Sequence, residues 1–228
     1  ICLDRQIISI PPREGAFAQY VTMPERNLVN VPTDYSLDKA ALVEPLAVGW
    51  HTAKLATNAI NANMKKKALV IGGGAIGLAT ALALRAMGIT ELTILEFNPL
   101  RREYLLKHID AEVLENTENS FPLVIDAVGF ASTRSVASQL VSPGGIIAHV
   151  GLGDNANGLD IRRITLQEIT FIGTYAYTVQ DFKDTAEALF TGRLGLLDWI
   201  EKRPLSEGEY CFRNLLKNTV ASPKIVLK

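Results

Sequence analysis

Runs of consecutive apolar, β-prone residues recur along the chain, and the stretches between them carry apolar residues at helical spacing. Six runs are centred near positions 70, 94, 113, 125, 148 and 171, and helical stretches cover 75–87, 99–109 and 131–141. Unbroken apolar runs are typical of strands that a parallel sheet buries on both faces. We therefore predict an α/β fold with a doubly wound parallel sheet of six strands in the order 3-2-1-4-5-6. Residues 115–122 are too few for a crossover helix between the third and fourth strands.

The amino-terminal part has a different pattern. Residues 1–35 are rich in turn residues, and β-prone residues at alternate positions in 16–22 predict short strands. Helices are predicted over 37–43 and 45–55, separated by Glu44-Pro45, because proline suits the first turn of a new helix.

The carboxyl-terminal tail reads as an amphipathic helix over 179–191, a further helix over 207–217 and a strand over 224–227. The first helix carries an apolar stripe that we interpret as core, formed by Phe182, Ala186, Leu189 and Phe190. We expect this tail to pack on the amino-terminal part. The predicted domains are therefore 1–44 and 179–228, together forming a partial second domain, and 45–178, which carries the sheet.

Composition narrows the possible partners. The 228 residues include 23 Lys and Arg against 24 Asp and Glu, a balance that favours neither nucleic acid nor an anionic membrane as partner. Two cysteines, Cys2 and Cys211, cannot form a disulfide framework, which fits a reducing cytoplasm. No apolar run is long enough to span a bilayer and no signal peptide is visible, so we expect a cytoplasmic protein.

The first predicted strand of the sheet runs directly into a glycine motif. Gly72, Gly74 and Gly77 give the pattern G-x-G-x-x-G, followed by a helix. In this pattern the first glycine allows a tight turn, the second lets backbone approach a pyrophosphate, and the third lets the helix lie close to the sheet. Such a strand–glycine–helix unit predicts a Rossmann dinucleotide-binding domain, with the diphosphate at the helix N-terminus.

An acidic residue at the expected distance strengthens this prediction. Glu96 ends the second strand, 19 residues after Gly77, and an acid about 20 residues on binds the ribose hydroxyls of NAD. The alternative is a solvated acid at a strand end. Glu96 favours NAD over NADP, because a 2′-phosphate would meet a like charge there. Arg101 and Arg102, which could neutralise a phosphate, keep NADP open as the alternative.

Several longer motifs resemble the medium-chain dehydrogenase family, in particular its zinc-dependent alcohol dehydrogenases of the polyol (sorbitol) and threonine dehydrogenase branch. The resemblance covers nearly the whole chain but lacks the amino-terminal part of the family. Its most specific block is Glu-Pro-Leu-Ala-Val at 44–48, ahead of the glycine motif. The other carriers are Gly-Ala-Phe-Ala-Gln-Tyr-Val at 15–21, Val-Gly-Leu-Gly at 150–153 and Lys-Ile-Val-Leu at 224–227.

The resemblance implies a cofactor site assembled from several strand ends. Gly72, Gly74, Ala75, Ile76 and Gly77 would hold the pyrophosphate. Glu96 would bind the ribose, and Arg101 would lie near the adenosine. On the adenine side the resemblance places Ala127, Val128 and Gly129. Near the nicotinamide it places Val150 and Gly151.

The resemblance also implies zinc in the full-length family. Glu44 would stand at the catalytic zinc, as a ligand or one water away, and the alternative is an acid favoured by the start of a helix. Cys2 matches the last cysteine of a structural zinc lobe, although without three further ligands it is an orphan thiol. His51, His108 and His149 show no metal-ligand spacing, and we interpret them as packed or solvated.

The main functional hypothesis is hydride transfer between a secondary alcohol and NAD, with this stretch alone inactive. The alternative is a non-catalytic NAD(H)-binding protein or remnant; the block at 44–48 argues against a zinc-free quinone-reductase type. The expected substrate is a small alcohol, polyol or amino acid. The expected assembly is a homodimer or homotetramer, with 171–175 as the pairing edge.

Overall fold

The structure, a computed structural model, describes residues 4–64 and 66–228. Its main sheet has six parallel strands in the order β3-β2-β1-β4-β5-β6, so the predicted fold class and strand order are confirmed. The strands are β1 (Lys67–Ile71), β2 (Glu91–Leu95), β3 (Glu112–Leu114), β4 (Phe121–Asp126), β5 (Val141–His149) and β6 (Thr170–Gly173).

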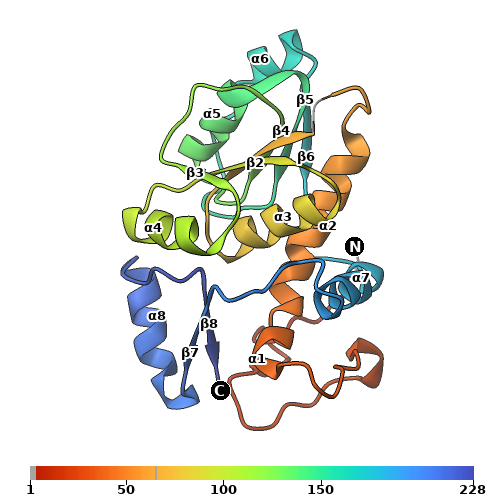
Figure 1. Cartoon of the computed structure of the whole chain (residues 1–228), viewed down its shortest axis with the longest axis vertical. Coiled ribbons are helices and arrows are strands. Elements are labelled where there is room, and N and C mark those ends of the chain that lie inside the picture. Colours follow the sequence, from red (N-terminus) through yellow and green to blue (C-terminus); the bar gives the residue numbers. More distant parts are fainter. Residues whose placement is uncertain (1–3, 65) are drawn as a thin grey trace.

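Helices cover both faces of this sheet, as Figure 1 shows. On one face α2 and α3 pack together so closely that a Cβ on Gly49 would lie 2.4 Å from the backbone of Ala79. On the other face α5 covers a second apolar cluster that includes Leu69 and Val124. The helices between residues 43 and 190 are α2 (Val43–Ala59), α3 (Ala75–Ala86), α4 (Pro99–His108), α5 (Ala131–Leu140), α6 (Ile161–Leu166) and α7 (Val179–Phe190).

Strand β1 lies at the centre of the sheet and is deeply buried. Residues 68–71 have no exposed surface, because β2 pairs on one side, β4 on the other, and helices cover both faces. The connection from β3 to β4 holds no helix, as its length predicted. All strands are parallel, so their carboxyl ends lie along one edge of the sheet.

Some predicted boundaries were wrong. The helix predicted over 131–141 ends at Leu140, and strand β5 begins directly at Val141, well before the run predicted near 148. It runs through Pro143-Gly144-Gly145, because Val141 already pairs with Phe121 of β4. Helix α2 begins at Val43, so Glu44-Pro45 lies inside its first turn and does not separate two helices. The short helix α6 was not predicted.

The predicted strand at 16–22 is absent. Between residues 4 and 35 the structure has only a 3-10 helix, η1 (Glu25–Asn27), and Phe17 and Tyr20 are exposed. A strand needs hydrogen-bonding partners, and no described strand lies beside this segment. Alternating β-prone residues were therefore insufficient to form a strand here.

The amino-terminal and carboxyl-terminal segments lie side by side below the sheet in Figure 1, and we call residues 4–40 and 192–228 the end lobe. Residues 43–190 form the sheet lobe, and residues 41, 42 and 191 connect the two lobes. The elements of the end lobe include α1 (Leu37–Ala40), β7 (Ile200–Arg203), η2 (Leu205–Glu207), α8 (Gly208–Leu216) and β8 (Lys224–Leu227). Strand β7, which pairs in parallel with β8, was not predicted.

Contacts join the amino-terminal and carboxyl-terminal segments of the end lobe. Lys39 pairs with Asp198 at 2.7 Å, and the ring of Phe17 packs edge-on against Phe212. Lys202 pairs with Asp38 at 2.7 Å. These contacts agree with the expectation that the tail packs on the start of the chain, while the domain boundaries 1–44, 45–178 and 179–228 stay predictions. No described helix has both the length and the apolar character to cross a membrane.

Candidate functional site

The loop between β1 and α3 is shaped by glycines that the fold itself requires. Gly72 has a φ of +95°, a conformation that side-chain-bearing residues rarely adopt. A Cβ on Gly77 would lie 1.8 Å from the carbonyl oxygen of Gly72, so α3 can approach the loop only with glycine there. These two glycines are therefore explained by packing alone.

Gly74 is different, because nothing in the chain requires it. Its φ is −70°, and a Cβ built on it would meet no atom within 4 Å. It lies at the N-terminus of α3, where the first backbone N–H groups have no intrahelical acceptor and no side chain caps them. The result is an open position beside free N–H donors, which suits the close approach of a phosphate.

The Glu96 carboxylate lies against the glycine loop. One oxygen, Oε2, accepts a hydrogen bond from the backbone N–H of Gly73 at 2.9 Å, and Oε1 accepts one from that of Asn98 at 2.8 Å. Arg101 lies beside the same carboxylate, with Nη1 3.5 Å from Oε2. Glu96 is 6% exposed, so the interpretation as a solvated strand-end acid is wrong.

Asp126, at the end of β4, organises the loop 127–129 and was missed by the sequence analysis. Its Oδ1 accepts hydrogen bonds from the backbone N–H groups of Val128 and Gly129. Its backbone carbonyl accepts two more, from Val150 and Gly151. An aspartate that ends an apolar run and directly precedes a glycine-containing turn is the sequence signal that could have indicated this role.

The loops after β4 and β5 touch each other through their glycines. A Cβ on Gly129 would lie 2.3 Å from the backbone of Gly151, and a Cβ on Gly151 would lie 2.2 Å from that of Val128. Glycine at both positions is therefore needed for this contact, whether or not a ligand binds. Gly72 lies next to Val128 and Gly77 next to Ala127, which joins these loops to the glycine motif.

The structure thus brings the predicted cofactor residues together along the carboxyl edge of the sheet, at the ends of β1, β2, β4 and β5. They are Gly72, Gly74, Ala75, Ile76, Gly77, Glu96, Arg101, Ala127, Val128, Gly129, Val150 and Gly151. This edge, at the point where the strand order reverses, is where open α/β sheets bind ligands.

The predicted metal residues do not form a site in the described chain. Glu44 is exposed, and its carboxylate accepts a hydrogen bond from the Tyr177 hydroxyl at 3.1 Å. Burial, reinforced by the negative Glu44, raises the pKa of Tyr177 above its usual range. Residues 4–64 and 66–228 contain no group of three His, Cys, Asp or Glu side chains able to hold a metal ion. Cys2 lies outside the described residues.

A buried ionic cluster joins α2 to α7. The carboxylate of Asp181, fully buried, lies 2.8 Å from Nδ1 of His51 and 2.9 Å from Nζ of Lys54, and it also accepts from Thr178. Burial alone would raise the pKa of Asp181, but hydrogen bonds from Thr178, Lys54 and His51 outweigh it and hold that pKa far below its usual range. His51 is therefore a packed histidine, as predicted, with a partner that the sequence did not show.

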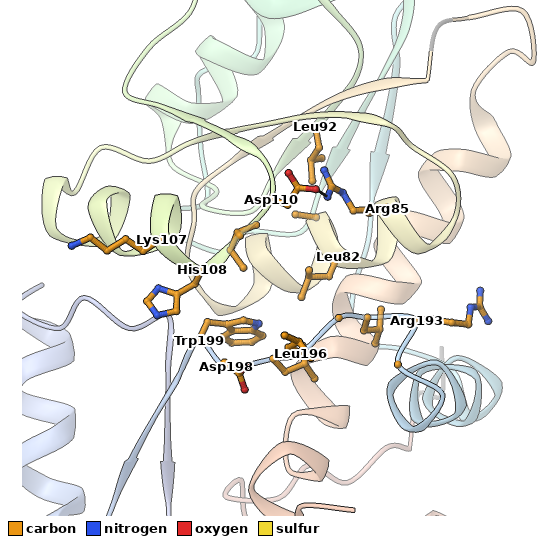
Figure 2. A pocket seen from close by; sticks show the side chains of 16 residues that line it. Leu82, Arg85, Leu92, Lys107, His108, Asp110, Arg193, Leu196, Asp198 and Trp199 are labelled. Atoms are coloured by element: carbon orange, nitrogen blue, oxygen red, sulfur yellow. Dashed lines mark hydrogen bonds and ion pairs between the residues drawn. The ribbon is translucent and has the colours of Figure 1, made fainter.

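A cavity of about 510 Å³ lies elsewhere (Figure 2). It is lined by the carboxyl-terminal half of α3, the end of α4 and the segment 192–199 that leads into the end lobe. Leu82, Arg85 and Trp199 are among its walls. This cavity is at the opposite end of α3 from the glycine loop, so it is separate from the cofactor edge.

Comparison with known proteins agrees with this geometry. The sequence model of the zinc-binding dehydrogenases matches residues 75–191. The chain is 28% identical over 250 residues to the (R,R)-butanediol dehydrogenase of Saccharomyces cerevisiae, and the match covers 100% of this chain and 64% of that protein. It is 31% identical over 214 residues to a probable (R)-acetoin-forming diacetyl reductase of the same yeast, covering 86% of this chain and 50% of that protein.

Solved structures show the same fold. An Escherichia coli oxidoreductase of unknown specificity superposes with a TM-score of 0.87 at 24% identity, covering 100% of this chain and 69% of the other. The acetophenone reductase of Geotrichum candidum, solved in complex with NAD, superposes with a TM-score of 0.80 at 22% identity, covering 93% and 62%. The chain belongs to the zinc-binding dehydrogenase family. It spans 50% to 64% of the length of these two yeast relatives.

Proposed function

We propose that the carboxyl edge of the sheet binds NAD, and the observation that carries this proposal is the open position at Gly74. Packing explains Gly72 and Gly77, but neither packing nor backbone conformation explains a glycine at 74. A pyrophosphate close to the backbone does explain it, and the free N–H groups of Ala75 and Ile76 would hold that group. The residues present therefore fit the cofactor.

Glu96 supports NAD as the cofactor. A carboxylate has about four lone-pair sites, and Glu96 uses three of them, for the N–H groups of Gly73 and Asn98 and, at 3.5 Å, for Nη1 of Arg101. One ribose hydroxyl would take the remaining site and the second would replace the long Arg101 contact, whereas a 2′-phosphate would be repelled by the same negative charge. Arg101 would lie near the adenosine, on the outer side of this carboxylate.

For the whole protein, we propose oxidation of a small secondary alcohol or polyol, or the reverse reduction. Bound NAD supplies the hydride acceptor. Ala127, Val128 and Gly129 would flank the adenine side, and Val150 and Gly151 would hold backbone against the nicotinamide. The relatives named as a butanediol dehydrogenase and a diacetyl reductase support a small alcohol or ketone as substrate.

Zinc chemistry does not fit the described residues alone. A catalytic zinc takes three protein ligands, and Glu44 is the only described candidate. We therefore expect no zinc-dependent turnover from this stretch by itself. The same observation favours the second candidate function, a non-catalytic NAD(H)-binding protein. Production of NADH from a polyol in the presence of zinc, with one zinc bound per chain, would contradict our expectation and exclude this second candidate.

We also propose pairing of two chains through β6. This strand is at the edge of the sheet, its outer backbone groups have no partner strand in the described chain, and Phe171 is 39% exposed. Homodimers or homotetramers are therefore the expected assemblies.

The test of the cofactor proposal is a fluorescence titration with NADH and NADPH. We expect saturable binding of NADH, with an affinity at least about tenfold higher than that for NADPH. Gly74→Ala should weaken NADH binding at least about tenfold without changing stability, because its Cβ meets solvent in the free protein. Gly208→Ala, in the end lobe, where a Cβ would make only an ordinary contact of 3.4 Å with the Leu227 side chain, is the control and should leave binding unchanged. Equal affinity of Gly74→Ala and wild type would contradict the proposal.

A further inference from the structure

Two arginines at the start of α4 bear on the choice of cofactor. Arg101 and Arg102 follow Glu96 by five and six residues, and basic side chains at this turn are the usual means of binding a 2′-phosphate. Their presence is why the sequence alone leaves NADP open. The structure shows what each guanidinium does in the folded chain.

Arg102 is held between the ends of β2 and β3. Its Nη1 donates to the backbone carbonyl of Glu96 at 2.8 Å, and its Nη2 lies 3.0 Å from Oε2 of Glu115. Glu115 directly follows β3, so this carboxylate draws the guanidinium toward the outer edge of the sheet. The Arg102 side chain is 22% exposed, which leaves it partly reachable from solvent.

Each arginine at this turn therefore has its own carboxylate. Arg101 pairs with Glu96, and Arg102 pairs with Glu115. A 2′-phosphate would bring a charge of about −1.5 to −2 into a group of side chains that is already balanced. It would have to compete with Glu115 for Arg102 and would be repelled by both carboxylates.

We propose that Glu115 contributes to cofactor specificity by keeping Arg102 from a 2′-phosphate. Glu115 lies at the carboxyl end of β3, outside the set of predicted cofactor residues, and acts through the position and the charge of Arg102. This inference rests on the proposed binding of NAD at the same site. It assigns to a residue outside the glycine motif a part of the discrimination that Glu96 alone would otherwise provide.

The test compares Glu115→Gln with Glu118→Gln, titrated with NADH and NADPH. Glu118 is an exposed acid three residues further along the same loop, so the control removes an equal charge from the same region. We expect Glu115→Gln to tighten NADPH binding roughly threefold, in line with the strength of an exposed ion pair, and to change NADH binding less than twofold. The gain should disappear in high salt, because salt screens the freed Arg102 charge.

A second variant shows whether Arg102 transmits the effect. In an Arg102→Ala background, Glu115→Gln should no longer improve NADPH binding. An unchanged NADPH-to-NADH affinity ratio in Glu115→Gln would overturn the inference while leaving NAD binding established. A threefold gain that persists in Arg102→Ala would also overturn it. A wild-type chain that binds neither nucleotide would overturn the proposed function, and the inference with it.

Discussion

Strands β1 and β8 have similar sequences and different surroundings. Both begin with lysine and continue as short apolar runs, Lys67–Ile71 and Lys224–Leu227. Residues 68–71 have no exposed surface, since β1 lies between β2 and β4. Strand β8 pairs only with β7, and all four of its residues are half-buried. The run of β1 is fully buried because strands pair on both of its sides and helices cover both faces, whereas β8 has a strand on one side only.

The same difference separates the two lobes as a whole. The sheet lobe carries six paired strands with helices on both faces, whereas the end lobe has two strands of four residues each, below the size at which a sheet is stable by itself. The end lobe also exposes large apolar side chains, among them Phe17, Tyr20, Leu37, Phe212 and Leu216. We therefore expect the sheet lobe to determine the stability of this chain and the end lobe to depend on it.

The largest loss of stability should come from the centre of the sheet lobe. Gly77→Ala places a Cβ 1.8 Å from the carbonyl oxygen of Gly72, and neither backbone segment can move without displacing α3 or β1. We expect a loss of about 4 kcal/mol in the free energy of unfolding, measured by urea denaturation. Gly173→Ala, where the Cβ meets nothing, should change it by less than about 0.5 kcal/mol. Equal losses in both variants would show that the glycine loop is not tightly packed.

The next largest loss of stability should come from the ionic cluster of Asp181, His51 and Lys54, which joins α2 to α7. Asp181→Asn turns one acceptor oxygen of this fully buried carboxylate into an NH2 group that faces the donors of Thr178 and Lys54, and we expect a loss of about 2 kcal/mol at neutral pH. Asp184→Asn, one turn further along α7, is the control and should cost less than about 0.5 kcal/mol.

The pH dependence of the free energy of unfolding gives a second test of this ionic cluster. The pKa of Asp181 is lower in the folded chain than the unfolded value of about 4, so its stabilisation is complete above that pH and is lost as the pH falls below it. The unfolding free energies of wild type and Asp181→Asn should therefore converge below pH 4. Parallel curves down to pH 2 would contradict the low pKa.

The sheet lobe was predictable because its signals are local. Each strand is an apolar run, and the glycine motif and Glu96 are read directly from their neighbours in sequence. The missed features depend on distant partners. Strand β7 contains one apolar residue, Ile200, and exists because it pairs with β8. Asp181 contacts His51, which lies 130 positions away in the sequence. At that separation the pattern of charges along the chain does not indicate which side chains will pair.

The prediction of a strand at 16–22 was wrong because a suitable local pattern has no partner strand in the described chain. Its local pattern is that of a strand, with Phe17 and Tyr20 among alternating β-prone residues, but the described chain provides no strand beside it. Local propensity was overridden by the lack of a partner. The residues that we propose for the cofactor follow from local motifs, and their binding role stays a prediction. The role of Asp126, which holds two loops of this edge, was missed because the sequence does not show that its carboxylate is buried and faces the loop.

Within the end lobe, Ser222 offers a moderate test. Its buried hydroxyl donates to the backbone carbonyl of Trp199 at 2.9 Å and so fixes the start of β7 against β8. Ser222→Ala should lower the free energy of unfolding by about 1 kcal/mol, because a buried carbonyl loses its donor. Ser206→Ala, an exposed serine of the same lobe, is the control. A loss as large as that of Gly77→Ala would mean that the end lobe carries as much stability as the sheet lobe, against the comparison above.

The smallest effect on stability should come from the exposed face of α8. Leu216 is 84% exposed, so Leu216→Gln should change the free energy of unfolding by less than about 0.5 kcal/mol. It should nevertheless reduce concentration-dependent self-association in sedimentation experiments, because exposed apolar side chains on the end lobe form a surface that other copies can bind. Lys217→Gln, at the adjacent exposed position, should leave association unchanged. If Leu216→Gln lowered stability by 2 kcal/mol or more, this face of α8 would be packed within the chain, and the end lobe would be more complete than its two short strands indicate.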